Sequence, residues 1–203
     1  FFSCHPQINY FGIGKEDNIS YLNEDIEFIF EVLLKYSRRS FYSQNKDFYQ
    51  RRIKESLSDK KVNLVSNEHL LMNFTLQGID PDEKLERLRE LFQGFNMTAI
   101  VIYREDSEKF LYSLYKEICK MGYFAEPYSN FKDWIEKFQD RNFKEDIDHE
   151  KKTKNLSNYF DRVETISFES IVHDEICLNE YFSKLLKIKN KNLAIENKNI
   201  SIT

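Results

Sequence analysis

The sequence predicts an α/β fold, in which short buried strands alternate with longer helices. Apolar runs at residues 62–65, 97–103 and 163–168 are separated by segments with helical periodicity, and this alternation is typical of α/β domains. Residues 97–103 are apolar almost throughout, as strands of a parallel sheet are when helices cover both faces. We therefore expect a three-layer α/β sandwich with a central parallel sheet.

The first part of the chain is predicted to be a loop followed by two helices. Residues 1–14 are rich in aromatic side chains and are interrupted by Pro6 and Gly12, which predicts a loop. Residues 24–36 carry so many apolar side chains that we expect a helix buried on more than one side. Residues 47–58 predict a second helix with a basic face.

The middle of the chain contains the clearest start and stop signals. Residues 62–65 predict a buried strand, and Ser66 is suited to cap a short helix after it. Asp80 and Pro81 predict the N-cap and the first position of another helix, which Gly94 ends.

The second half of the chain is predicted to continue the alternation, with Ser107 capping the helix that follows strand 97–103. The later elements are an aromatic helix, a charged exposed loop, a strand and a final helix, at residues 131–138, 144–154, 163–168 and 174–188. Residues 189–203 are rich in Asn and Lys and predict a loop or tail. We therefore expect a single domain over residues 1–188.

The composition excludes several classes of protein. The 203 residues carry a formal net charge of -4, which argues against a nucleic-acid-binding protein. The three cysteines, Cys4, Cys119 and Cys177, are scattered, so we expect neither a zinc site nor a disulfide scaffold. No apolar run approaches the ~20 residues of a membrane helix, and no signal peptide is visible. These features predict a cytoplasmic protein. A Golgi-lumen protein whose N-terminal anchor had been removed would have the same composition.

The strand–turn–helix unit around Arg104 is the most informative part of the sequence. Arg104 directly follows strand 97–103, at the carboxyl edge where open α/β sheets bind their ligands. Ser113 follows nine residues later on the next helix. A guanidinium, a hydroxyl and a helix N-terminus together indicate a phosphate site. The alternative is a surface arginine paired with Glu105 or Asp106, with Ser113 facing a neighbouring helix.

Residues 103–115, Tyr-Arg-Glu-Asp-Ser-Glu-Lys-Phe-Leu-Tyr-Ser-Leu-Tyr, resemble the 3'-phosphate-binding motif of the sulfotransferases that use 3'-phosphoadenosine 5'-phosphosulfate (PAPS). In that family an Arg at the end of a strand and a Ser on the next helix contact the 3'-phosphate of the cofactor. The resemblance implies these roles for Arg104 and Ser113. Asp106 stands where the family often has Pro.

Further segments resemble the same family in the same order. They are the Ser-Asn-Glu-His-Leu stretch after the strand at residues 62–65, the late strand ending in an aromatic-Glu pair, the opening segment and the terminal Asn-Ile-Ser, at residues 66–70, 159–171, 4–12 and 199–201. The resemblance implies a sheet of P-loop nucleotide-binding ancestry. We expect Glu169, in the late segment, to hold a loop by accepting backbone hydrogen bonds.

The family also has a Lys-containing loop that wraps the 5'-phosphosulfate, and this sequence contains no equivalent. No GxxxxGK[ST] motif occurs, and the chain begins at Phe1. Because residues 1–12 resemble the segment that comes after the loop and its helix, we expect that the sequence lacks the segment that carries the loop.

The resemblance implies a sulfotransferase that moves a sulfuryl group from PAPS to a hydroxyl of a carbohydrate or small-metabolite acceptor, without a metal. We predict Glu68 as the catalytic base, with His69 as the alternative base or a substrate contact. The alternative for Glu68 is a first-turn acid that complements the helix dipole, and for His69 a packed side chain. Two other functions stay open: another P-loop transferase such as a small-molecule kinase, which would need Mg²⁺, and a non-catalytic sulfotransferase-like binding protein.

The remaining histidines and the single tryptophan have weaker assignments. His5 is a candidate for lining the acceptor cleft, although a loop histidine more often has no such role. His149 and His173 lie in polar stretches, and we expect them to face solvent. Trp134 and its aromatic neighbours predict a packing cluster or, alternatively, a wall of the acceptor pocket.

Overall fold

The computed structural model describes residues 5–12, 23–34, 36–67, 70, 79–120, 130–138, 148–173 and 175–189. The chain divides into two compact units. The first unit comprises Phe1–Phe95 and Glu175–Thr203, and the second unit comprises Asn96–Asp174. Each unit contains one pair of parallel strands, so the chain is a mixed α/β protein as predicted. The prediction of a single domain over residues 1–188 stays a prediction.

The strand pair of the first unit consists of β1 (Ile8–Phe11) and β2 (Val62–Val65), which run parallel with Ile8 opposite Val62. The predicted strand at residues 62–65 is confirmed, whereas the loop predicted for residues 1–14 is wrong over β1. The strand escapes sequence reasoning because it is short and lies between Pro6 and Gly12. A Cβ at Gly12 would overlap the outer end of the Tyr10 side chain, so a larger residue directly after β1 would require that ring to move.

The apolar helix predicted over residues 24–36 begins at the expected residue but changes from an α-helix to a π-helix. Asn23 caps α1 (Glu24–Phe28) by accepting the backbone N–H of Ile26 at 3.0 Å. The helix then continues as a π-helix, η2 (Ile29–Leu33). Its apolar side chains form the centre of the first unit and are at most 4% exposed, namely Ile26, Ile29, Phe30, Leu33 and Leu34.

The next helix, α2 (Arg39–Ser56), starts eight residues earlier than the helix predicted over residues 47–58. Tyr42 explains the early start, because its side chain is buried and its hydroxyl donates to Glu90 Oε2 at 2.9 Å and to the carbonyl of Arg87 at 3.0 Å. Burial, followed by the bond to Glu90, raises the pKa of Tyr42 far above its ordinary value. This tertiary anchor has no signature in the local sequence.

The N-cap predicted at Asp80 and the first helical position predicted at Pro81 are confirmed by α3 (Pro81–Leu91). Asp80 accepts the N–H of Asp82 at 2.9 Å, and Gly94 adopts φ +92° after the helix. Arg87 is 1% exposed and donates to the carbonyls of Leu33 and Ser37 at 3.1 and 2.9 Å. A buried arginine therefore satisfies the backbone carbonyls at the end of the preceding helical segment.

The final helix, α9 (Glu175–Leu185), lies within the predicted range. Among the side chains that the structure describes in and after this helix, Phe182, Ser183 and Ile188 are buried. Tyr181, Leu185 and Leu186 were expected inward and are only half-buried. Ile176, expected inward as well, has a side chain outside the described part of the structure.

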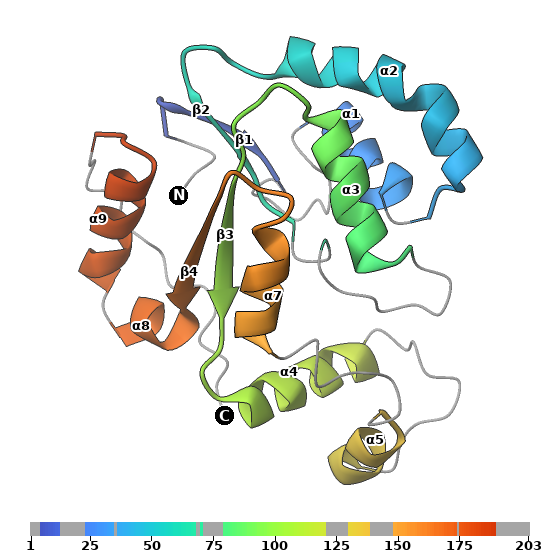
Figure 1. The fold of residues 1–203 in the computed structure, drawn as a ribbon. Coiled ribbons are helices and arrows are strands. Elements are labelled where there is room, and N and C mark those ends of the chain that lie inside the picture. The colour runs from blue at the N-terminus through green and yellow to red at the C-terminus, as the bar shows by residue number, and fades with distance from the viewer. Residues whose placement is uncertain are drawn as a thin grey trace. The chain divides into compact units, whose positions relative to one another are not determined.

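The second unit contains the best-predicted strand. The parallel pair is β3 (Thr98–Tyr103) and β4 (Arg162–Ser167), in register from Thr98 opposite Arg162 to Tyr103 opposite Ser167. The helix α7 (His149–Leu156) packs against both strands (Figure 1). The expectation that helices cover both faces of β3 is wrong at Ile102, which is 54% exposed. Ile102 points to the opposite face from Tyr103, whose ring meets α7.

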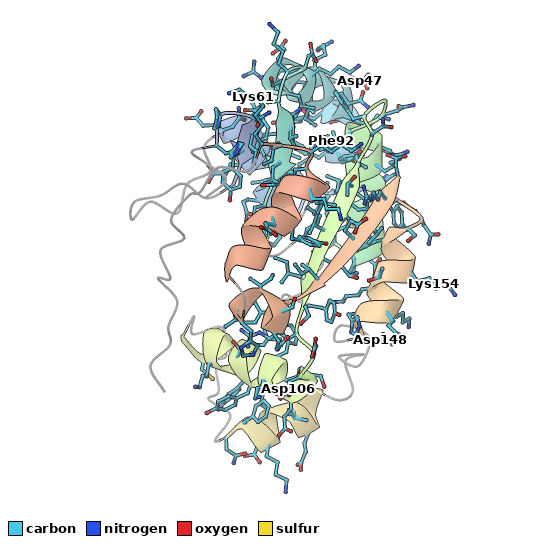
Figure 2. The ribbon with its side chains drawn as sticks, turned by 90° about the vertical axis from the view of Figure 1, so that its left-hand side faces the viewer. Asp47, Lys61, Phe92, Asp106, Asp148 and Lys154 are labelled. Atoms are coloured by element: carbon cyan, nitrogen blue, oxygen red, sulfur yellow. The ribbon has the colours of Figure 1, made fainter. Side chains whose placement is uncertain are left out.

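Three more helices complete the second unit. They are α4 (Ser107–Lys120) and α5 (Phe131–Phe138), both predicted, and α8 (Phe168–His173), which sequence analysis missed. The charged loop predicted over residues 144–154 is wrong from residue 149, where α7 begins. Asp148 lies at the start of this helix (Figure 2) and caps it by accepting from Lys151 N at 2.9 Å. The one buried side chain of α7 is Leu156. A helix with so few apolar positions gives no periodic signal.

Candidate anion-binding site

The candidate site lies at the carboxyl end of the second unit's strand pair. Tyr103 and Ser167 are opposite each other as the last residues of β3 and β4. The residues that follow these two strand ends are therefore also neighbours, and their side chains point to the same face. These residues are Arg104 and Phe168, and the guanidinium carbon lies 4.5 Å from the centre of the phenyl ring.

Arg104 keeps its hydrogen-bond donors available. The side chain is half-buried, and its guanidinium makes neither a hydrogen bond nor an ion pair with the described part of the chain. The alternative of a surface ion pair with Glu105 or Asp106 is therefore wrong, since Asp106 instead pairs with Lys109 at 3.2 Å. A planar guanidinium that is held by one face, and whose edge has no partner among the described residues, suits an anion with several oxygens.

Glu169 holds the loop that follows Arg104. Its Oε2 accepts the backbone N–H of Glu105 at 3.1 Å and lies 3.3 Å from Ser167 Oγ. The hydrogen bond from Glu105 is the first reason that the pKa of Glu169 is lowered, and the Ser167 hydroxyl and the Arg104 charge lower it further. This confirms the prediction that Glu169 holds a loop through backbone hydrogen bonds.

The N-terminus of α4 is capped by Asp106 and not by Ser107, so the predicted cap is wrong by one residue. Asp106 Oδ1 accepts the N–H of Lys109 at 3.0 Å, and this bond is the first reason that the pKa of Asp106 is lowered. Ser107 is instead the first residue of the helix, directly after Asp106, which Figure 2 labels. A carboxylate therefore already accepts backbone N–H groups at this helix end.

Ser113 lies in the second turn of α4, roughly 9 Å along the helix axis from its first residue. Its side chain is exposed, whereas the neighbouring Leu114 is buried at 8% exposure. The hydroxyl makes no hydrogen bond within the described residues, and none joins it to Arg104. The two predicted phosphate ligands thus lie in one strand–helix unit without contacting each other through hydrogen bonds, and their shared role stays a prediction.

The predicted catalytic residues Glu68 and His69, and the short helix predicted after Ser66, lie outside the described residues. The structure does describe the approach to them. Ser66 N donates to the carbonyl of Phe11 at 3.0 Å, and Asn67 Nδ2 donates to Glu31 Oε1 of η2 at 3.0 Å. The chain leaving β2 is therefore fixed as far as Asn67.

The histidines differ from their predicted environments. His5 is 3% exposed; its Nδ1 accepts from Gln7 N at 3.2 Å, and its Nε2 lies 3.3 Å from the carbonyl of Lys189. These bonds give His5 a structural role in the first unit. The prediction that His149 faces solvent is wrong, because its half-buried ring stacks on Tyr103 at 4.1 Å with 3° between the planes. His173 is exposed as predicted.

Trp134 belongs to an aromatic cluster between α4 and α5, as predicted. The indole is fully buried and lies 5.6 Å from the ring of Tyr115 and 5.9 Å from that of Phe131. Phe131 also meets Tyr112 edge-on at 5.2 Å. Since no face of Trp134 is exposed, packing is the role that this geometry supports.

Sequence reasoning missed Phe168 and His149 as neighbours of the strand end. Phe168 was read as the end of a strand, and the alignment of Tyr103 with Ser167 that brings it beside Arg104 is a property of the paired strands. Residues 149–154 were read as part of a charged loop. The one sequence signal for Phe168 is that it lies at the end of a predicted strand, and no such signal marks His149.

Within the described ranges, no group of three or more His, Cys, Asp or Glu side chains is arranged to hold a metal ion. None of the helices in the same part of the chain is long and apolar enough to cross a membrane.

Comparisons with known proteins found no match to a family model, to a curated protein or to a solved structure. The resemblance of residues 103–115 to the sulfotransferase motif therefore stays a prediction. Any function proposed for this chain is therefore based on the geometry around Arg104.

Proposed function

We propose that this protein is a PAPS-dependent sulfotransferase in which Arg104 binds the 3'-phosphate of the cofactor and Ser113 adds a hydrogen bond. The acceptor would be a hydroxyl of a carbohydrate or small metabolite. One observation carries the proposal: at the carboxyl end of a parallel strand pair, the guanidinium of Arg104 is held against Phe168 while its donors are not hydrogen-bonded to described residues.

This arrangement suits a phosphate for two reasons. The donors of a guanidinium form a fork that matches two oxygens of a phosphate group, and charge-assisted bonds of this kind are the strong ones. The carboxyl ends of parallel strands are where open α/β sheets bind nucleotides. We also propose that the fold is a three-layer sandwich of P-loop ancestry. The two pairs of parallel strands support this part of the proposal.

The proposed transfer assigns one chemical task to each predicted residue. When bound, PAPS supplies a sulfuryl group whose bond to the 5'-phosphate oxygen breaks as a bond to the acceptor oxygen forms, and the electron pair leaves with adenosine 3',5'-bisphosphate. Glu68 takes the proton of the acceptor hydroxyl, with His69 as the alternative base. Arg104 and Ser113 orient the cofactor through its 3'-phosphate, remote from the transferred group.

Calorimetric titration with adenosine 3',5'-bisphosphate tests the assigned phosphate site. We expect Arg104→Ala to weaken binding about 10- to 100-fold, since hydrogen bonds to charged groups contribute roughly 1.5–3 kcal/mol. Ser113→Ala should weaken binding less, about 2- to 10-fold, because its hydroxyl is neutral.

Arg162→Ala is the matched control for this titration. Arg162 is exposed, belongs to the same unit, pairs with Glu164 and lies at the opposite end of the strands from Arg104. Removing it changes the net charge equally, so we expect less than about a 2-fold effect at physiological salt. An Arg104→Ala protein that binds the bisphosphate as tightly as the unchanged protein would refute the site. Preference for ATP with Mg²⁺ over the bisphosphate would favour the kinase alternative.

A further inference from the structure

We propose that Phe168 is a positioning residue, which fixes the plane of the Arg104 guanidinium so that its free edge faces a phosphate. The inference rests on the proposed function, because it concerns the same phosphate site. It adds a residue that the sequence did not suggest and assigns a purpose to the contact between the ends of β3 and β4.

The register of the two strands brings the two residues together. With Tyr103 opposite Ser167 as the last pair, Arg104 and Phe168 follow at the same end of the strands. The guanidinium lies over the ring at 4.5 Å, a distance at which a cation is attracted to the face of an aromatic ring. One face of the guanidinium is thereby covered, and a ligand can approach its edge.

The ring itself is held in place by the first turn of α8. Ser167 Oγ accepts the N–H of Ser170 at 3.2 Å, and Ser170 Oγ donates to the Ser167 carbonyl at 2.8 Å. These bonds fix the backbone on which Phe168 is carried. The backbone that carries the Phe168 ring beneath Arg104 is therefore fixed before any ligand binds.

Glu169, the next residue, fixes the backbone of the same site. Its carboxylate accepts the N–H of Glu105, directly after Arg104, while the β3 ladder fixes the residues before it. Adjacent residues thus control two parts of the arginine: Phe168 restrains the side chain and Glu169 the main chain. A long side chain restrained in this way loses less conformational freedom when it binds a ligand.

The test compares Phe168→Leu, which removes the ring but keeps an apolar side chain, with the conservative Phe168→Tyr. The Arg104 Nε–Hε resonance is assigned by its loss in Arg104→Ala and is followed by NMR in the ligand-free chain. Inorganic phosphate and then adenosine 3',5'-bisphosphate are titrated separately. We expect the ring to shift the Arg104 Hε resonance upfield in the unchanged protein and in Phe168→Tyr, but not in Phe168→Leu.

For both anions, Phe168→Leu should weaken binding about 2- to 5-fold, the range expected for an exposed cation–π contact, and Phe168→Tyr should restore it. In an Arg104→Ala background, Phe168→Leu should have no further effect on affinity. A merely structural role would instead weaken binding equally in both backgrounds, and that result would overturn the inference.

The two anions separate this inference from the proposed function. Phosphate binding that depends on Phe168, without tighter binding of the bisphosphate, would support the positioning role and contradict the sulfotransferase assignment. Bisphosphate binding that needs Arg104 but is unchanged by Phe168→Leu would support the assignment and overturn the positioning role. If neither anion shifts the Arg104 resonance, both fail.

Discussion

At the scale of single residues, the site depends on which polar groups already have partners. Asp106 and Glu169 are carboxylates beside Arg104, yet each is engaged with a backbone N–H, that of Lys109 or Glu105. These bonds direct both negative charges toward the main chain, so the guanidinium stays available. The sequence placed Asp106 beside Arg104 but did not bring Glu169 to this site, and it did not show which pairs form.

Glu169 provides a pH-dependent signal at this scale. Its pKa is lowered below the ordinary 4.5, first by the Glu105 hydrogen bond. A lowered pKa in the folded state means that the interaction stabilises the protein above the unfolded pKa and is lost as pH falls through the folded pKa. We therefore expect the Glu105 amide resonance to titrate with a midpoint below 4.5.

Glu169→Gln is the control for this NMR titration. A glutamine oxygen can still accept from Glu105 but carries no titrating charge, so this transition should vanish while the amide stays hydrogen-bonded. A midpoint at or above 4.5 for Glu105 in the unchanged protein would contradict the assigned cause.

At the scale of elements, helix starts were predicted well where capping chemistry was local. Asp80 and Pro81 begin α3 as the sequence indicated, whereas α2 begins eight residues early because Tyr42 is anchored to another helix. The cap of α4 was misplaced by one residue, since Asp106 and Ser107 are both good capping residues. Local chemistry narrows a boundary, and tertiary contacts choose the exact residue.

The Asp80 cap gives a stability prediction for the first unit. Asp80→Ala removes the acceptor for Asp82 N and should lower the free energy of unfolding by about 1 kcal/mol. Urea denaturation measures the change, with Asp59→Ala as the control, because Asp59 is exposed in a turn outside any helix. Equal effects of the two substitutions would show that the cap contributes nothing specific.

At the scale of the whole molecule, the first unit is closed by segments from both ends of the described chain. His5 and Gln7 contact the two backbone polar groups of Lys189. His5 Nε2 lies 3.3 Å from the Lys189 carbonyl, and Gln7 Oε1 accepts the Lys189 N–H at 2.8 Å. The segment leading into β1 and the segment after α9 are therefore joined by polar bonds around a buried imidazole.

His5→Ala should consequently destabilise the first unit by about 1–2 kcal/mol, because it removes two hydrogen bonds of a buried side chain. Hydrogen exchange should increase in residues 5–12 and 180–189 more than in α3. His173→Ala, at an exposed histidine of the second unit, should change neither. Unchanged exchange at Gln7 and Lys189 in His5→Ala would contradict the predicted closure.

The sequence by itself determined the mixed α/β class, the strands at residues 62–65 and 98–103, and the position of Arg104 at a strand end. These features depend on apolar runs and breakers that lie within a few residues of one another. Only the tertiary structure decided that β1 is a strand, that residues 149–156 are a helix and that Phe168 lies beneath Arg104. Each of these depends on a partner distant in sequence, because strand register and buried anchors are set by packing between elements.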